Sequence, residues 1–391
     1  MSRINDLIKE LCPNGVEFKK LEDCCNILDN KRKPICKGIR EMGEYPYYGA
    51  NGIQDYISDY IFDGKYVLVG EDGSVQTPNG TPIVNWAIGK IWVNNHAHII
   101  EEIDGVSLRY LYHYLQIVDV KDLIHGNIPK LNQSSFRNIK IAVPPLEVQE
   151  EIVKILDKFG ELESELESEL EARKNQYEFW RGTIISNSNG KDGKLIELLS
   201  GPITDGPHTT PKFVSDGIPF VSASAVHEGK IHLKDAQGFI TKEFDNECSR
   251  KYKPRKWDVY MVKSGSTTGK VAIVDIDADF NIWSPLAAMR TDNEITSRYL
   301  YHLLQTKDVQ EQVRNRMSHG SQPNLSMRVL EQFDIKIPTL EEQYCIVNIL
   351  DKFDKLINDI SEGLPAEIEL RRKQYEYYRN KLLNFEDIQY E

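Results

Sequence analysis

The feature of this sequence that most constrains its fold is a long internal repeat. Residues 143–159 read VPPLEVQEEIVKILDKF, and residues 337–353 read IPTLEEQYCIVNILDKF in the same register. Downstream, RKNQYEFWR recurs as RRKQYEYYR, and upstream LRYLYHYLQ recurs as SRYLYHLLQ. A repeat of this extent means that one structural plan occurs twice along the chain. The sequence therefore predicts a tandem duplication.

The two copies of the repeat predict long helices that pair with each other. Apolar residues recur at steps of three and four along both copies. A narrow apolar stripe on a helix of about 40 residues is typical of a coiled-coil seam, and two matching helices pack most economically antiparallel. Prolines 144, 145 and 338 mark the helix starts, and Gly363-Leu364-Pro365 should kink the second helix. The first seam is predicted to contain Ile152, Leu156, Phe159, Leu162, Leu166, Leu170, Tyr177, Trp180 and Ile184.

A globular segment of mixed type precedes each helix. Both segments carry short β-rich runs followed by a helical pattern, so the predicted fold class is α+β, with two similar mixed domains separated by two long helices and an internal pseudo-two-fold duplication. A length of 391 residues also favours two hydrophobic cores over one. The expected divisions are 1–143 for the first domain, 144–186 for the first helix, 187–194 for a linker, 195–337 for the second domain and 338–391 for the second helix. The expected strands are 56–62, 66–69, 83–88 and 91–93 in the first domain and 218–221, 259–262, 271–274 and 287–290 in the second, followed by helices over 108–116 and 297–316.

The net charge of -12 argues at first against nucleic-acid binding. Its distribution changes that interpretation, because the two helical segments contribute -6 and -5, whereas residues 1–143 and 191–337 carry only -2 and +1. The globular domains are thus nearly neutral. We expect the acidic helices to face protein partners or to stand away from any DNA.

Several classes of protein are disfavoured. The chain shows no apolar run long enough to cross a membrane, and its six cysteines lack paired CxxC spacing, so we expect free thiols and a cytoplasmic protein without a metal site. A zinc site built from Cys12, Cys24, Cys25 and Cys36 is disfavoured because adjacent cysteines are poor tetrahedral ligands. GSTTGK, residues 265–270, is one residue short of a phosphate loop. No catalytic residues are predicted.

Two kinds of segment suggest DNA binding instead. Basic runs suit phosphate contacts, and the alternative for each run is a solvated turn. Polar loops could contact base edges, although each such residue alone would more often stabilise a turn. The basic candidates are Lys31, Arg32, Lys33, Arg250, Lys251, Lys253, Arg255, Lys256, Lys263 and Lys270. The polar candidates are Asn94, Asn95, His96, His98, His208, Thr209, Thr210, Ser264, Ser266, Thr267, Thr268, Ser321, Gln322 and Asn324.

Over essentially its whole length, the chain resembles the specificity subunits of type I restriction-modification systems. The resemblance is carried by the repeated PLxxQ to ILDKF helix entrance, the RK(x)QYE exit, YYGANGIQDYI, GKIWVNNHAH, DGPHTTPKF, TTGKVAIV and HGSQPNLS. It implies that each domain reads one half of a split, asymmetric site in double-stranded DNA, and that the helices separate the domains and hold two methyltransferase subunits. Restriction subunits would join them. S-adenosylmethionine, ATP and magnesium would then serve only the partners, and this chain would hold no cofactor.

Alternative functions remain at this point. They are the specificity subunit of a methylation-only or related bipartite-site system, a structural coiled-coil adaptor without DNA preference, and a stand-alone enzyme with a hidden active site. Genes for a methyltransferase and a helicase-nuclease next to this one would argue against the adaptor.

Overall fold

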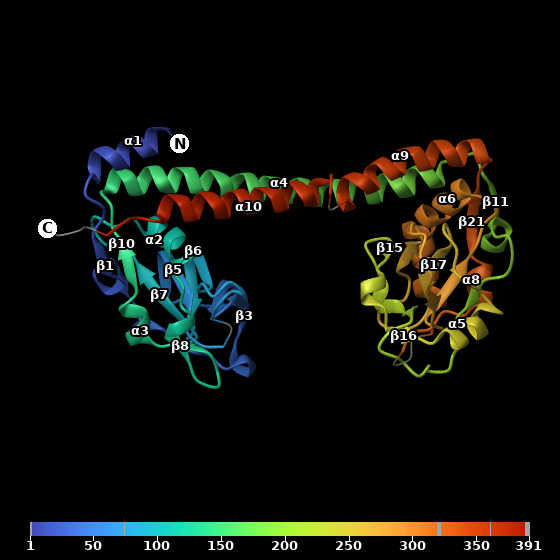
Figure 1. The fold of residues 1–391 in the computed structure, drawn as a ribbon, viewed down its shortest axis with the longest axis horizontal. Helices are drawn as coiled ribbons and strands as arrows, with labels where there is room; N and C mark the ends of the chain where they lie inside the picture. Colours follow the sequence, from blue (N-terminus) through green and yellow to red (C-terminus); the bar gives the residue numbers. More distant parts are fainter. Residues whose placement is uncertain (1, 74, 319–321, 360, 388–391) are drawn as a thin grey trace. The chain divides into compact units, whose positions relative to one another are not determined.

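The computed structural model describes residues 2–73, 75–318, 322–359 and 361–387. The chain divides into two compact units: unit 1 comprises residues 1–165 and 368–391, and unit 2 comprises residues 166–367. Each unit contains one globular domain, part of the long helix α4 (Leu146–Ser186) and a helix from the second repeat (Figure 1). We call the globular parts domain 1 (residues 1–143) and domain 2 (residues 195–337).

Domain 1 is built on a six-stranded mixed sheet with the strand order β2-β7-β5-β6-β3-β4. All neighbouring strands are antiparallel except β3 and β6, which are parallel. The last five residues of β5, Tyr66–Gly70, and the first four of β7 are all buried, so both faces of the sheet are covered there. Their bounds are β2 (Asn26–Ile27), β3 (Met42–Gly49), β4 (Gly52–Ile57), β5 (Phe62–Gly70), β6 (Val84–Val93) and β7 (Ala97–Glu101).

Domain 2 has a similar strand arrangement, but its outer hairpin runs in the reverse chain order, because the later strand β15, and not the earlier β14, lies next to β18. Its main sheet has the order β12-β20-β17-β18-β15-β14, and the only parallel neighbours among these described strands are β15 and β18. Strand by strand, β12, β20, β17 and β18 correspond to β2, β7, β5 and β6. The bounds are β12 (Thr204–Asp205), β14 (Val226–His227), β15 (Lys230–Ile231), β17 (Val259–Val262), β18 (Val271–Ile273) and β20 (Leu286–Met289).

Smaller elements complete both domains. Two-stranded pairs close each domain beneath its helices: β1 (Phe18–Lys20) with β10 (Lys140–Ala142), and β11 (Lys191–Lys194) with β21 (Asp334–Ile337). A hairpin joins β8 (Ile124–His125) to β9 (Lys130–Leu131). Domain 2 has a further sheet of β16 (Gly238–Ile240), β13 (Ile218–Val221) and β19 (Asn281–Ile282). The shorter helices are α1 (Ser2–Leu11), α2 (Leu108–Leu115), α3 (Gln133–Arg137), α5 (Lys242–Ser249), α6 (Glu294–Leu304), α7 (Lys307–Arg316) and α8 (Met327–Glu331).

The repeated segments form the predicted long helices, and they pair antiparallel within each unit. In unit 1, Phe159 of α4 stacks on Tyr378 of α10 (Leu364–Leu383), and Glu163 further along α4 pairs with the earlier Arg372. In unit 2, Tyr177 of α4 stacks on Phe353 of α9 (Leu340–Asn358), and the Asn189 N–H just after α4 donates to Glu342 Oε1 near the start of α9 at 2.9 Å. The predicted α+β class and helix pairing are therefore confirmed.

Five local predictions differ from the structure. Residues 56–62, predicted as one strand, comprise the last two residues of β4, the connection 58–61 and the first residue of β5. The predicted kink is a full break, because α9 ends at Asn358 and α10 begins at Leu364, with Pro365 in the first turn, where its missing N–H costs little. The predicted single helix 297–316 is divided between α6 and α7, because the Thr306 side chain caps a new start by accepting a hydrogen bond from Val309. Residues 83–88 and 91–93, predicted as two strands, belong to one continuous strand, β6, which begins at Val84. Lys191–Lys194, predicted as linker, form β11.

The seam prediction also needs one correction. Ile152 and Leu156 are fully buried in unit 1, and Tyr177 is buried in unit 2, as predicted. Trp180, however, is 41% exposed, whereas Arg181 and Ile185 are buried. The buried positions at this end of α4 thus follow a step of four from Tyr177. Arg181 is buried in place of Trp180 because this side of α4 contacts domain 2, where Arg181 donates a hydrogen bond to the backbone oxygen of Gln305 at 2.9 Å.

Candidate functional site

The same set of backbone hydrogen bonds occurs in each domain just after the end of an inner strand of the main sheet, β5 in domain 1 and β17 in domain 2. In domain 1, Glu71 directly after β5 donates its N–H to the His96 oxygen at 2.8 Å and accepts from the Leu131 N–H at 2.8 Å. Gly73 then donates to the oxygen of Pro129 at 3.0 Å, and an isolated antiparallel bridge joins Asp72 to Lys130. We call this arrangement platform 1.

Platform 2 repeats each of these bonds in domain 2. Lys263 directly after β17 donates to the Pro285 oxygen at 2.8 Å and accepts from the Leu325 N–H at 2.7 Å, and Gly265 donates to the Pro323 oxygen at 3.0 Å. Ser264 and Asn324 form the bridge. Gly73 and Gly265 both have positive φ, 81° and 104°, which explains the glycine at this turn in both halves. The platform is thus duplicated even though the surrounding loops differ.

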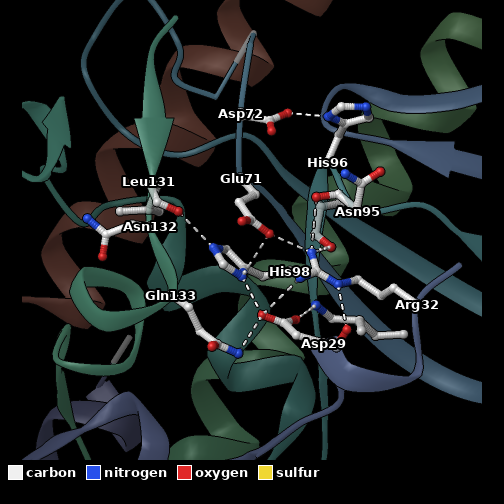
Figure 2. Close-up of polar contacts among 12 residues, drawn as sticks. Asp29, Arg32, Glu71, Asp72, Asn95, His96, His98, Leu131, Asn132 and Gln133 are labelled. Atoms are coloured by element: carbon white, nitrogen blue, oxygen red, sulfur yellow. Dashed lines mark hydrogen bonds and ion pairs between the residues drawn. The ribbon is translucent and has the colours of Figure 1, made fainter. Parts of the chain in front are cut away.

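The basic run of domain 1 lies beside platform 1, but its central residue, Arg32, is largely covered and ion-paired. Figure 2 shows the Arg32 guanidinium among Glu71, Asp29 and backbone oxygens, with Nη1 2.6 Å from Glu71 Oε2 and 2.6 Å from the Ala97 oxygen. Only 11% of the Arg32 side chain is exposed. Lys31 and Lys33 are exposed. Phosphate contact by this run stays a prediction, and it now rests on the two lysines.

The polar segment Asn94–His98 comprises the turn 94–96 between β6 and β7 and the first two residues of β7, a strand that the sequence did not predict. Asn94 is buried and accepts a hydrogen bond from the His96 N–H at 2.8 Å. His98 is fully buried, with Nδ1 2.7 Å from Asp29 Oδ2 and Nε2 2.8 Å from the Leu131 oxygen (Figure 2). The exposed members are Asn95 and His96, whose ring contacts Asp72. Base contact is therefore a prediction for these two residues, whereas Asn94 and His98 hold the turn.

The pKa of Asp29 is lower than its ordinary value. Burial by itself raises this pKa, but hydrogen bonds from His98 and the Ile99 N–H, together with the Arg32 charge, outweigh it. Asp29, Glu71 and His98 also place possible metal-ligand atoms within 4.8 Å of one another. The Arg32 guanidinium bonds both carboxylates, so a side-chain cation already takes the place that a metal would occupy.

In domain 2 the basic candidates are engaged by buried carboxylates. Asp205, at the end of β12, is 1% exposed and pairs with Lys251, with Lys263 at 3.4 Å and with His208 at 3.4 Å. Lys253 contacts Asp245 at 2.9 Å and also Asp279. Within the described chain, no ion pair involves Arg250, Arg255 or Lys256. The Lys256 ammonium lies 5.0 Å from the centre of the Trp257 ring. Phosphate binding by this run therefore stays a prediction for those three.

Most of the polar candidates between Ser264 and Lys270 lie in the loop that connects β17 to β18. Ser266 and Lys270 are exposed, Thr267 is half-buried, and the Thr268 hydroxyl donates to the oxygens of Gly265 at 2.7 Å and Pro323 at 3.5 Å. β18 rather than a helix follows the loop, as the missing phosphate-loop spacing implied. Thr209, Thr210 and Gln322 are exposed, and Ser321 lies outside the described residues.

A second duplicated feature fixes each domain to its helix pair. In unit 1, His113 of α2 lies with Nε2 2.8 Å from Asp157 of α4 and Nδ1 2.9 Å from the Tyr375 hydroxyl of α10. Because Asp157 accepts from Nε2, Nδ1 accepts from the tyrosine. Burial lowers the pKa of His113. We call this group joint 1.

Joint 2 has the same chemistry in unit 2. His302 of α6 lies with Nε2 2.7 Å from Asp351 of α9 and Nδ1 3.0 Å from the Tyr177 hydroxyl of α4. In both joints the tyrosine comes from the opposite copy of the repeat. The sequence analysis expected Tyr177 in the helix seam but missed the histidines, the aspartates and their hydrogen bonds to the tyrosines. The repeated YLYH, ILDKF and QYE motifs contain all of these residues and were the available signal.

Other side chains of chemical interest were also placed. The six cysteines are free, with Cys24, Cys25 and Cys248 buried. Burial raises the pKa of Cys24 to about 11 and that of Cys25 to about 12, so these thiols are poor nucleophiles. Among the described residues, no helix has the length and apolar character needed to cross a membrane.

Comparisons with known proteins agree with this duplicated arrangement. The family model described as "Type I restriction modification DNA specificity domain" matches residues 13–176 and 207–370. A Haemophilus influenzae protein named among the type I restriction enzyme specificity subunits is 37% identical over 393 residues, covering 97% of this chain and 98% of that protein. An Escherichia coli type I restriction enzyme specificity subunit is 32% identical over 292 residues, covering 71% of each.

Solved structures show a similar fold. The S subunit of a type I restriction-modification system from M. genitalium aligns with a TM-score of 0.54 at 14% identity, covering 94% of this chain and 96% of that one. A chain from a structure on complex assembly and conformational transition of the type I system aligns with a TM-score of 0.59 at 14% identity, covering 95% and 98%. At this identity the likeness shows a shared fold.

Proposed function

Because this chain belongs to the family of type I restriction-modification DNA specificity domains, we propose that it is a specificity subunit that reads a two-part, asymmetric site in double-stranded DNA. The observation that carries the proposal is the duplicated platform. Both domains hold the same backbone frame, yet present different side chains from it. Two similar frames with unlike side chains suit two unlike half-sites.

The chain would act through partners. We propose two methyltransferase subunits and, in a restricting system, restriction subunits. Support comes from large apolar side chains exposed at matching positions of the two repeats: Phe179 and Tyr377 are 64% and 60% exposed, and Leu146 and Leu340 are 42% and 54% exposed. Exposed apolar groups repeated in this way fit two copies of one protein partner.

Catalysis would belong to those partners. The chain itself would hold no cofactor, and the partner subunits would use S-adenosylmethionine, ATP and magnesium in the cytoplasm. The test is methylation of DNA by the homogeneous chain and by the chain mixed with its methyltransferase subunits. Adenine methylation should appear only in the mixture and at one bipartite sequence. Methylated adenine from the chain alone, or methylation without a two-part site, would contradict the proposal.

The two-partner arrangement can be tested with matched variants. Phe179→Asp and Tyr377→Asp should each weaken one methyltransferase site by at least about tenfold, because a charge would replace an apolar contact at the centre of an interface. Native mass measurement should then show one bound methyltransferase where the unmodified chain binds two. Glu178→Gln, at the neighbouring exposed position, is the control and should retain both. Loss of both partners from either single variant would argue against two equivalent sites.

A further inference from the structure

Each platform directs one pair of side chains outward. In platform 1 the bridged residues Asp72 and Lys130 lie next to Glu71 and Leu131, which are buried. Successive side chains of extended backbone point to opposite faces, so burial of the second pair directs the first toward the surface. Their exposure agrees, since 22% of the Asp72 side chain and 47% of the Lys130 side chain are accessible. The Asp72 carboxylate contacts the His96 ring, and Lys130 Nζ lies 3.1 Å from Glu71 Oε1, so contact with a base would exchange these partners for DNA.

Platform 2 has the same alternation. Ser264 and Asn324 are the bridged pair, and their neighbours Lys263 and Leu325 are buried. In both platforms backbone bonds on either side enclose the pair without involving its side chains. Such a non-hydrogen-bonded antiparallel pair brings two side chains close together on one face. The frame therefore fixes the position of the pair while leaving its chemistry free to vary.

The chemistry does vary between the two domains. Asp72 and Lys130 offer an acceptor and a cationic donor, whereas Ser264 and Asn324 offer a hydroxyl and an amide. Carboxylates accept from cytosine N4, lysine donates to guanine, and asparagine pairs with adenine. Different pairs on one frame would thus favour different bases.

Each pair also lies beside polar residues singled out from the sequence. The His96 ring contacts Asp72, and the Thr268 hydroxyl bonds to the oxygens of Gly265 and Pro323 next to the second pair. A Cβ added at Gly73 or Gly265 would have no neighbour within 4 Å among the described residues, so the turn after each bridged residue is not covered by them. The platforms therefore combine a fixed backbone with outward polar groups.

We propose that Asp72 with Lys130, and Ser264 with Asn324, are the specificity-determining pairs of the two half-sites. This inference rests on the proposed DNA-reading function and names the residues that carry it out. Each pair contacts base edges, while the buried neighbours and the backbone frame keep its position. A change of one pair alters one position of one half-site.

The test transfers one pair onto the other frame. Ser264→Asp with Asn324→Lys gives domain 2 the side chains of domain 1 and leaves the net charge unchanged, so a general electrostatic effect on DNA affinity is balanced out. The double variant, assembled with its methyltransferase subunits, is analysed by sequencing all methylated sites. The expected result is a change of base preference by about tenfold or more at one position of one half-site, as for one good side-chain contact, with the other half-site unchanged.

A milder variant protects the test against loss of folding. Asn324→Ala removes one polar side chain but leaves the backbone bonds of platform 2, so it should relax the same position. Asp277→Asn, an exposed change elsewhere in domain 2, is the control and should leave the site unchanged. Active variants with the unmodified recognition sequence would overturn the inference. A wild-type complex that methylates no bipartite site would instead overturn the proposed function, so the two failures can be told apart.

Discussion

The two domains share the backbone frame of their platforms but differ in the charged side chains buried behind it. In domain 1 the first position of the platform is Glu71, neutralised by Arg32 and by Lys130. In domain 2 the same position is Lys263, neutralised by Asp205. The backbone bonds of the two frames agree within 0.1 Å, although the buried charge has the opposite sign.

This comparison shows how one frame accommodates different interiors. A buried charge is tolerated only with an opposite charge beside it, because removing one partner leaves an uncompensated ion in a poorly solvated place. Each domain satisfies the rule with its own set of partners. Asp29 lies just after β2, and Asp205 ends the equivalent strand β12. Arg32 and His208 each come three residues after these carboxylates, so the carboxylate position is shared, whereas the main cation partner is Arg32 in one domain and Lys263 in the other.

The largest effect is expected from reversing the charge in domain 2 alone. Lys263→Glu would place a carboxylate beside the buried Asp205 and should lower the free energy of unfolding by about 3–5 kcal/mol. Chemical denaturation followed by circular dichroism measures this. The comparison becomes sharper if His208→Arg, which copies the position of Arg32, recovers part of the loss in the same chain. A Lys263→Glu variant as stable as the unmodified chain would show that the two positions are not equivalent.

The next effect concerns joint 1 and pH. Because burial lowers the pKa of His113, the unfolded chain binds a proton there more readily than the folded chain. The stability from this group is present above the ordinary histidine pKa of 6.5 and is lost as the pH falls below it, with a slope approaching about 1.4 kcal/mol per pH unit for one proton.

The measurement is the free energy of unfolding between pH 7.5 and 5.5. His113→Gln cannot take up the proton and should show a flatter dependence than the unmodified chain. Equal slopes for both proteins would rule out His113 as the group responsible.

A smaller and symmetrical effect is expected from the tyrosines of the two joints. Tyr375→Phe and Tyr177→Phe each remove one hydroxyl that bonds a buried histidine, at 2.9 Å and 3.0 Å respectively. Each should cost about 1 kcal/mol, and the two losses should add, because the joints belong to separate units. Denaturation of both single variants and the double variant checks this. Clearly unequal losses would break the equivalence of the joints.

The smallest effect separates paired from unpaired lysines in the basic run of domain 2. Lys256→Ala should lower the slope of log affinity against log salt by about 0.9, as expected for one lost phosphate contact. Lys253→Ala should leave that slope unchanged, because its ammonium is engaged by Asp245 and Asp279. Binding of nonspecific duplex DNA across a salt series distinguishes them. The same slope change in both variants would mean that the ion pairs open when DNA binds.

The sequence by itself determined the features that depend on local pattern. The repeat predicted the duplication, and the steps of three and four along it predicted the long helices, because a helix places such residues on one side. Short β-rich runs indicated α+β domains. The polar loops around residues 94–98, 263–270 and 322–324 were also identified, and the structure places parts of all three at the platforms.

Only the tertiary structure decided which of those side chains remain available. Arg32, Lys251 and Lys253 looked like phosphate contacts, yet each pairs with carboxylates that lie far from it in sequence or across a turn. Composition cannot reveal such pairing, because it depends on which strands become neighbours. For the same reason the joints were missed: His113 lies 262 positions from Tyr375, and only the antiparallel pairing of the helices in unit 1 brings the two within a hydrogen bond.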